Sequence, residues 1–353
     1  MKKNENLYIP IQKKESFVQE KKKLLGIIFS RACCCLGIVI FHYFSHSEGN
    51  FKIFYTTANS SFGFMFVTSY FCISGAVLFY NYSQIKSIKI FYFKRWKSIF
   101  PQFYLFYIYF FISETLRKHE LVYKRKFYKI FFTLTGFDGY LLYKFNTFYL
   151  IGDWFLGPLI ILYLLYPFLC NLIAKNYIFS TSLLLSMNIF LYTTNFFTID
   201  PHRNIISCLN SFYFGITTIK FKKIFFDNNI SFIISFILLL FTSIIKIHPF
   251  VLLFQIQGFL LFITLTKIGQ YLMLKKVYFV FYNISILSYS IYLCHHRIIY
   301  DILSINNPNK WYSHLLLLSI AFLLIIILSK IHLIIVNHIF GSELFKKFES
   351  LFY

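Results

Sequence analysis

Long apolar runs dominate the chain, and short polar or basic segments separate them. A helix that crosses the hydrocarbon core of a bilayer needs about 20 mostly apolar residues, and ten runs approach that length. They cover residues 24–44, 62–82, 99–114, 150–171, 177–197, 204–219, 230–246, 249–268, 279–299 and 313–337. Several are slightly short, which helix tilt or local thinning of the bilayer accommodates. The pattern predicts an all-α polytopic membrane protein with about ten transmembrane helices.

The segment 115–149 interrupts this pattern because charged and aromatic residues alternate along it. Residues 124–129 are Lys-Arg-Lys-Phe-Tyr-Lys, and an apolar stretch follows over 130–134. We predict an external loop that carries an interfacial amphipathic segment. A further span over 127–143 is the alternative. An eleventh span would, however, place one half of the chain on the side of the membrane opposite to the one that its Lys and Arg residues indicate.

The composition also indicates a membrane protein. Of the 353 residues, 58% are hydrophobic and 14% charged, whereas soluble domains carry about 25% charged residues. A soluble globular enzyme and a disordered chain are therefore excluded. The net charge of +22 would suggest nucleic-acid binding in a soluble protein. Here the basic residues lie mostly between the apolar runs, so we expect them to set the topology and expect no nucleic-acid partner.

The distribution of Lys and Arg predicts the orientation, because cytoplasmic loops carry an excess of these residues. With a cytoplasmic N-terminus, 21 basic residues fall on the inner side and 12 on the outer side, and 115–149 holds seven of those 12. Both termini are therefore expected in the cytoplasm. Residues 1–23 then form a basic N-terminal segment, 24–337 a transmembrane domain and 338–353 a cytoplasmic tail. The expected location is the plasma membrane, which is the inner membrane of a bacterial cell.

Two ionisable residues lie within the first apolar run, where such groups are costly and indicate a functional site. Arg31 and His42 are 11 residues apart, so a helix places them on one face. They are separated by about 16 Å along the axis, at about 1.5 Å per residue. Arg31 is expected in the inner third of the membrane and His42 near its outer surface. Taken alone, His42 is slightly better explained as an interfacial histidine, because Tyr43, Ser45 and His46 follow it.

The ninth apolar run ends with a polar stripe. Tyr289, Tyr292 and His295 are spaced three residues apart and lie on one face of a helix. The outward direction of this span places His295 at the depth of His42, and two histidines from distant spans at one depth indicate a site. No Asp or Glu within the spans is expected beside them, which argues against a proton-coupled pump of the usual acidic kind.

A basic segment leads into the third apolar run on the inner side. Residues 93–101 are Phe-Lys-Arg-Trp-Lys-Ser-Ile-Phe-Pro. One interpretation is topological charge followed by a proline in the first helical turn. The other is a clamp for phosphates, such as those of a nucleotide-bearing donor, in which Arg95 and Lys97 take part.

The seven cysteines do not have the spacing of a metal site. Three of them form the run Cys33-Cys34-Cys35 within the first span. Packing of small residues in a helix is the simpler explanation for this run than a redox or lipidation role, and no metal ion is expected.

Five short motifs occur in order along the chain. They are Arg31 with His42; Phe71, Ser74 and Gly75; Lys94, Arg95, Ile99 and Pro101; Trp154, Phe155, Leu156, Tyr163 and Pro167; and Ser288, Tyr289, Tyr292, Leu293 and His295. Together they resemble the pattern of the membrane-bound acyltransferase 3 family, which moves acyl groups onto carbohydrates and related acceptors. Two positions depart from that pattern: Ser98 stands where a second Arg is common, and Leu159 where many members carry a Glu.

The resemblance implies an O-acetyltransferase that moves an acetyl group from acetyl-coenzyme A to a hydroxyl of a cell-surface glycan, such as an O-antigen, capsule or exopolysaccharide. Acetyl-coenzyme A is then a substrate and no bound cofactor is expected; the other partners are a surface-glycan or lipid-linked saccharide acceptor and membrane lipids. The resemblance implies three catalytic residues, His42, Arg31 and His295. It implies two donor-binding residues, Arg95 and Lys97, and four supporting residues, Ser74, Trp154, Tyr289 and Tyr292. Of these, His42 is the expected general base and His295 the second choice.

A transporter or flippase of glycan or lipid intermediates is the alternative, because it would use the same aromatic and cationic interior as a binding path. Transporters are often built from two similar halves, but residues 24–197 show no repeat in 204–337. A purely structural subunit of a polysaccharide-assembly complex would need neither His42 nor His295. The ordered motifs favour the enzyme.

Overall fold

The computed structural model describes residues 11–47, 51, 53, 56–58, 61–118, 126–148, 150–194, 196–247, 252–272, 277–305 and 310–350. Within these residues the chain forms thirteen α-helices, one 3₁₀-helix and one π-helix, with no sheet. The predicted all-α class is confirmed. The start of the basic N-terminal segment, part of the motif at 124–129 and the last three residues of the tail lie outside the described residues.

Each of the ten predicted segments contains a helix. The ten helices are α1 (Ile11–His46), α2 (Phe62–Tyr82), α3 (Ile88–Lys118), α6 (Leu156–Lys175), α7 (Tyr177–Thr193), α8 (Ile205–Lys220), α9 (Asn229–Ile244), α10 (Leu253–Leu272), α11 (Tyr278–Ile305) and α12 (Trp311–Phe340). Helix α2 coincides with its predicted run. Helices α1 and α3 extend well beyond theirs, because Lys, Arg and Glu are good helix formers and do not end a helix.

Four of the described helices are long and apolar enough to cross a membrane. They are the part of α1 from Leu25 to His46, then α2, α6 and α12, while α7 and α9 are apolar but shorter. Large apolar side chains are exposed along α9 and α12. Exposed apolar surface of this extent is unusual in a soluble monomer and fits helices that face lipid. The chain is a multi-pass membrane protein.

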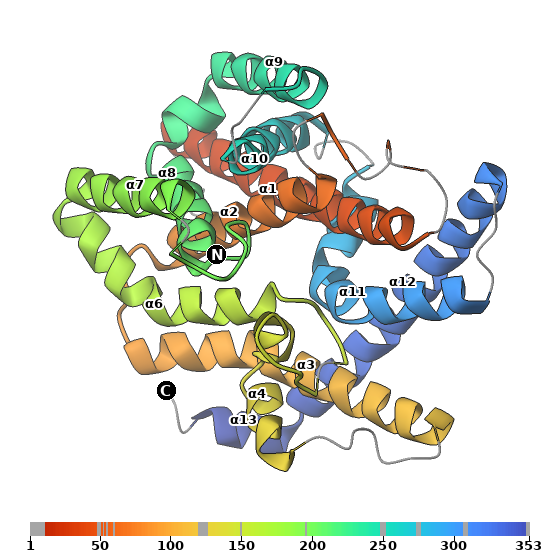
Figure 1. The fold of residues 1–353 in the computed structure, drawn as a ribbon. Coiled ribbons are helices and arrows are strands. Elements are labelled where there is room, and N and C mark those ends of the chain that lie inside the picture. The colour runs from red at the N-terminus through yellow and green to blue at the C-terminus, as the bar shows by residue number, and fades with distance from the viewer. Residues whose placement is uncertain are drawn as a thin grey trace, which may run out of the picture.

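Helix α1 lies at the centre of the bundle, where it packs against α2, α10 and α11 (Figure 1). Small buried side chains, Ala32, Cys34 and Cys35, lie along it. Small residues let neighbouring helices approach closely within a membrane. All seven cysteines are free thiols, which agrees with the prediction that the cysteine run packs the helix.

Two glycines mark the contact between α2 and α8. A Cβ on Gly75 would overlap the backbone carbonyl of Phe212, and a Cβ on Gly215 would overlap that of Cys72. The backbones lie so close that no side chain fits between them. The Ser74-Gly75 pair therefore has a structural reason: the glycine packs against α8, and the serine beside it faces the interior cavity described below.

The segment 115–149 differs from the predicted loop. Its first four residues continue α3, and its described remainder forms the short helices η2 (Phe127–Lys129), α4 (Ile130–Leu134) and α5 (Asp138–Leu141). Gly136, with a left-handed φ of 76°, separates α4 from α5, and α5 packs against α6. Helices of four or five residues are too short to span a bilayer, so the alternative span over 127–143 is wrong. The predicted external loop with an interfacial amphipathic segment stays a prediction.

The basic segment before the third run is also placed differently. Pro101 lies inside α3, well past its first turn, so the proposed role of proline as a helix start is wrong. Residues 94–97 belong to the same helix. Arg95 is therefore carried on a regular helix and not on a loop, which gives its side chain a defined direction.

Candidate functional site

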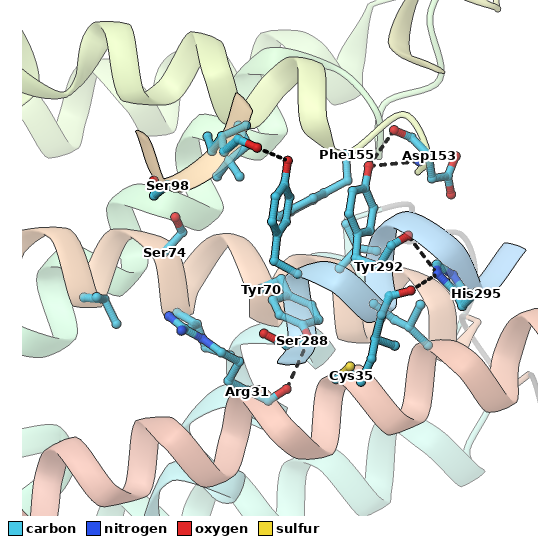
Figure 2. A pocket seen from close by; sticks show the side chains of 18 of the residues that line it. Arg31, Cys35, Tyr70, Ser74, Ser98, Asp153, Phe155, Ser288, Tyr292 and His295 are labelled. Atoms are coloured by element: carbon cyan, nitrogen blue, oxygen red, sulfur yellow. Dashed lines mark hydrogen bonds between the residues drawn. The ribbon is translucent and has the colours of Figure 1, made fainter. Parts of the chain in front are cut away.

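A cavity of about 300 Å³ lies between α1, α2, α3, α6 and α11. Aliphatic and aromatic side chains make much of its wall, and polar side chains reach it from all five helices or from the loop before α6. These polar residues are Arg31, His42, Tyr70, Ser74, Arg95, Ser98, Asp153, Tyr163, Ser288, Tyr289, Tyr292 and His295. Figure 2 shows Arg31 and Ser98 toward one end of the cavity and Asp153 and His295 toward the other.

Most of the residues predicted from the sequence meet in this cavity. Seven of the nine line it: Arg31, His42, Ser74, Arg95, Tyr289, Tyr292 and His295. They come from four helices that are distant in the sequence, and the predicted stripe on α11 faces inward as a unit. Lys97 and Trp154 do not line it.

Two histidines of the lining, His42 and His295, meet at one end of the cavity, which we call the histidine end; His296 lies beside them outside the lining. The ring centroid of His42 lies 5.1 Å from that of His295 and 3.8 Å from that of His296. The predicted match in depth between His42 and His295 thus corresponds to direct proximity. His296 was not predicted, and it completes the group.

Asp153 places a carboxylate beside these rings. Its Oδ2 lies 3.5 Å from His296 Nε2 and 3.9 Å from His42 Nε2, which corrects the expectation that no Asp or Glu accompanies the histidines. Asp153 precedes α6 and lies outside that helix. Burial alone would raise the pKa of its carboxyl, but His296, the backbone N–H of Trp154 and the charge of Arg203 outweigh burial and hold this pKa below its ordinary value. The carboxylate is therefore ionised at neutral pH.

The loop before α6 is held on α11 by backbone hydrogen bonds. Gly152, with a φ of 72°, turns the chain, and its N–H donates to the carbonyl of Leu293 at 3.1 Å. The hydroxyl of Tyr292 donates to the carbonyl of Asp153 at 2.7 Å and accepts the N–H of Asp153 at 2.9 Å. The N–H of Trp154 donates to Asp153 Oδ1 at 2.7 Å. Tyr292 thus fixes the position of the Asp153 carboxylate.

The backbone of α11 sets the tautomer of His295. Its Nδ1 lies 3.0 Å from the carbonyl oxygen of Ile291 and 2.9 Å from that of Tyr292. Carbonyl oxygens only accept, so Nδ1 carries the proton and Nε2 of the neutral ring carries the lone pair. This Nε2 is buried and has no hydrogen-bond partner among the described residues. His295 therefore presents a free acceptor nitrogen toward the histidine end.

The other end of the cavity, which we call the arginine end, holds the guanidinium group of Arg31 (Figure 2) and that of Arg95, which lines the cavity one helical turn before Ser98 on α3. The guanidinium carbon of Arg95 lies 5.3, 5.8 and 5.9 Å from the ring centroids of Tyr82, Tyr163 and Phe91, and such faces attract a cation. Neither arginine takes part in the salt bridges found within the described residues. Both cations therefore remain available to an anionic ligand.

Lys97 is directed away from the cavity. Its Nζ forms an ion pair of 2.7 Å with Oε2 of Glu349, which belongs to the C-terminal helix α13 (Glu343–Ser350). The structure thus separates the two residues predicted to bind the donor: Arg95 lines the cavity, and Lys97 holds the tail.

Trp154 is buried beside the cavity without lining it. Its ring centroid lies 6.3 Å from that of Phe71, and the guanidinium carbon of Arg203 lies 5.7 Å from the Trp154 ring. His202, in the loop before α8 (Ile205–Lys220), packs on the same side with its centroid 6.2 Å away. Burial lowers the pKa of His202 to about 4, so this neighbour is neutral. Trp154 supports the loop that carries Asp153.

Hydrogen bonds between helices hold the cavity wall together. The hydroxyls of Ser74 and Tyr163 lie 3.1 Å apart and link α2 to α6. The hydroxyl of Tyr289 donates to the carbonyl of Ile99 at 3.3 Å and links α11 to α3. These two predicted supporting residues join the helices that enclose the cavity.

Sequence reasoning assigned no role to His296 or Asp153. The available signals were the His295-His296 pair, which sets two imidazoles about 100° apart around one helix, and the position of Asp153 directly before Trp154. Neither signal identifies the partner helices, so proximity to His42 becomes visible only in the fold.

Comparison with protein-family models, curated proteins and solved structures finds no match. The resemblance to the acyltransferase 3 family therefore stays a prediction, and the functional argument rests on the residues of the cavity.

Proposed function

We propose that the chain is an integral membrane O-acyltransferase that moves an acetyl group from acetyl-coenzyme A to a hydroxyl of a cell-surface glycan. One observation carries this proposal: a single cavity holds imidazole bases at one end and uncompensated arginines at the other. Acyl transfer from a coenzyme A thioester needs both features, a base for the hydroxyl and cations for the phosphates. The ordered motifs of the acyltransferase 3 family point to the same reaction.

The reaction needs a base at the acceptor hydroxyl. His42 takes the hydroxyl proton, the oxygen attacks the thioester carbonyl carbon, and the bond from that carbon to sulfur breaks. The departing thiolate is protonated, so the net reaction moves one proton from the hydroxyl to the thiol. An imidazole suits this step because its neutral form carries a lone pair that accepts a proton. The Asp153 carboxylate, 3.9 Å from His42 Nε2, stabilises the imidazolium that forms.

The arginine end receives the donor. Charge-assisted hydrogen bonds from guanidinium groups are strong ligands for phosphates, and Arg95 is placed to provide them. Arg31 and His42 are separated by about 16 Å along α1, so one reacting carbonyl cannot contact both. We therefore assign Arg31 to positioning the donor arm, and His42 to the chemistry.

The proposed topology has ten spans, both termini in the cytoplasm and a location in the plasma membrane. The ion pair between Lys97 and Glu349 supports it, because it joins the tail to the segment 83–98, and the charge distribution assigns both to the inner side. Reporters fused at residues 130 and 225 test this. We expect an external reporter at 130 and a cytoplasmic one at 225, and the reverse result would contradict the orientation.

The function is tested by comparing the O-acetyl content of purified surface glycans from cells with and without the protein. We expect acetyl esters that depend on the protein. Purified protein in detergent, given radiolabelled acetyl-coenzyme A and the glycan, should then form the labelled ester. A transporter or flippase would change the amount of glycan at the surface without forming the ester, so unchanged ester content would overturn the proposal.

A further inference from the structure

The histidine end has the geometry of a metal-binding site. His42, His295 and His296 each present one ring nitrogen, and these three nitrogens lie within 4.8 Å of one another. The Oδ2 atom of Asp153 lies 3.5 Å from His296 Nε2 and 3.9 Å from His42 Nε2. We call these four residues the histidine cluster. It joins α1, α11 and the loop before α6.

One nitrogen of the cluster has no polar partner. The Nε2 atom of His295 is buried and forms no hydrogen bond within the described part of the chain, whereas Nε2 of His296 faces Asp153 Oδ2 at 3.5 Å. His295 is only 1% exposed, and its Nδ1 proton is already committed to backbone carbonyls. A buried polar atom without a partner is destabilising. A bound cation that accepts the lone pair of His295 would remove this cost.

The spacing of the three rings suits one shared ion. The ring centroids of His295 and His296 lie 5.1 and 3.8 Å from that of His42, and the Asp153 carboxylate lies beside His42 and His296. One divalent cation can take a lone pair from each ring together with the carboxylate.

We propose that the histidine cluster binds one divalent transition-metal ion of the Zn²⁺ class. Imidazole nitrogens and one carboxylate are usual zinc ligands. Tetrahedral bonds of about 2.0–2.1 Å hold ligand atoms about 3.4 Å apart, so the nitrogens need to converge by less than about 1.5 Å. In metal sites the second nitrogen of a ligand histidine usually donates to a carbonyl or carboxylate, which fixes the ring. The hydrogen bonds from His295 Nδ1 to backbone carbonyls fix its ring in the same way.

The effect on catalysis rests on the proposed function. A metal ion bound to His42 occupies the lone pair that would accept the hydroxyl proton. Metal-loaded protein should therefore not transfer the acyl group, and a chelator should restore the transfer. Metal binding itself needs no acyl transfer, so the two claims can fail separately.

The first experiment measures metal binding directly. Full-length protein is purified in detergent, freed of metal with a chelator and titrated with Co²⁺, followed by its visible ligand-field absorption, and then with Zn²⁺ as competitor. We expect one equivalent of Co²⁺ per chain, displaced by Zn²⁺, and an increase in melting temperature with either metal. Weak binding without saturation, which marks an adventitious ion only, would overturn the site.

The second experiment identifies the ligands. His296→Ala, and the more conservative His296→Gln, should each weaken binding by at least the roughly 10- to 100-fold that loss of an outer-shell partner costs. His46→Ala is the matched control, because His46 is an exposed neighbour whose ring lies 5.7 Å from that of His296 without belonging to the cluster. Equal losses in the His296 and His46 variants would contradict the ligand set. Gel filtration and helical circular dichroism verify the fold of each variant.

The third experiment compares acetylation with and without added Zn²⁺ in the same preparations. We expect Zn²⁺ to inhibit wild-type protein and to have a smaller effect on His296→Ala. Stoichiometric binding without inhibition would refute the effect on catalysis and leave the metal site standing. Absence of acetylation in all preparations would refute the proposed function and leave the titration result unchanged.

Discussion

The two ends of the cavity differ in the kind of charge that they hold. The arginine end has permanent cations, Arg31 and Arg95, among aromatic walls, and its guanidinium groups form none of the salt bridges found in the described residues. In place of permanent cations, the histidine end has the imidazole nitrogens of His42 and His295, with the carboxylate of Asp153 beside them. The first arrangement suits retention of an anion, and the second suits transfer of a proton.

The separation between the two ends explains how one cavity can both retain the donor and transfer a proton. Arg31 and His42 share a face of α1 but are about 16 Å apart, so a donor held by its phosphates at one end can present a distant reacting group at the other. A substitution at one end should therefore change one kinetic property and leave the other. The following predictions test this division, from the largest expected effect to the smallest.

The largest effect is expected at His42. A positioned general base contributes about 10²- to 10⁴-fold, so His42→Ala should lower glycan acetylation by that factor. His42→Gln keeps hydrogen-bonding ability but cannot take the proton near neutral pH, and it should be almost as inactive. Acetylation is measured at matched protein levels in the membrane, with His46→Gln as the control on the same helix. Near-normal transfer by His42→Gln would shift the base assignment to His295.

The next effect is expected at Arg95. Hydrogen bonds to charged groups contribute about 1.5–3 kcal/mol, which corresponds to about 10- to 150-fold in affinity. Arg95→Ala should weaken acetyl-coenzyme A binding by that factor, measured by calorimetry on the purified protein, while expression and membrane insertion persist. Unchanged donor affinity would return this segment to a purely topological role.

A smaller effect is expected at Asp153. Asp153→Asn keeps the size of the side chain and removes the charge that stabilises the His42 imidazolium. Two charges 4 Å apart interact by about 1 kcal/mol in water and about 4 kcal/mol at intermediate dielectric. The Asp153 side chain is 29% exposed, which favours the lower part of this range, so we expect about a tenfold lower transfer rate. A tenfold loss of donor affinity instead would place Asp153 at the wrong end of the cavity.

The smallest effect is expected at Lys97. Its ammonium pairs with Glu349 and does not line the cavity. Lys97→Ala should change donor affinity by less than about threefold, because the side chain pairs with the tail and does not reach the donor. It is the matched control for Arg95→Ala, two residues away on the same helix. Comparable losses of donor affinity in both variants would show that Lys97 leaves Glu349 and binds the donor. Lys97 would then replace the second arginine of the family pattern, where this chain has Ser98.

The positions of the long helices could be predicted because they depend on the apolar runs themselves. Predicted and observed bounds agree at residues 62–82, where polar segments flank the run on both sides. The prediction was too short at α3, because charged residues before Ile99 continue a helix as readily as they end one. The short helices over 126–148, separated by Gly136 and packed against α6, had no signal in the apolar pattern.

The site was predictable only along each helix. Periodicity places Arg31 and His42 on one face of α1, and Tyr289, Tyr292 and His295 on one face of α11, and all five line the cavity. Which helices lie opposite these faces depends on packing such as the contact between α2 and α8. The nearness of Asp153 and His296 to His42, and the turn of Lys97 toward the tail, follow from that packing and have no local signal.

The most direct test of the division between the two ends is a kinetic comparison of His42→Gln and Arg95→Ala. Both purified variants are assayed for acetyl transfer over a range of acetyl-coenzyme A concentrations, with donor affinity measured separately by calorimetry. We expect His42→Gln to lower kcat by about 10²-fold or more with donor affinity unchanged. We expect Arg95→Ala to raise KM for the donor by about tenfold or more with little change in kcat. Loss of donor affinity in His42→Gln, or a loss confined to kcat in Arg95→Ala, would contradict this division.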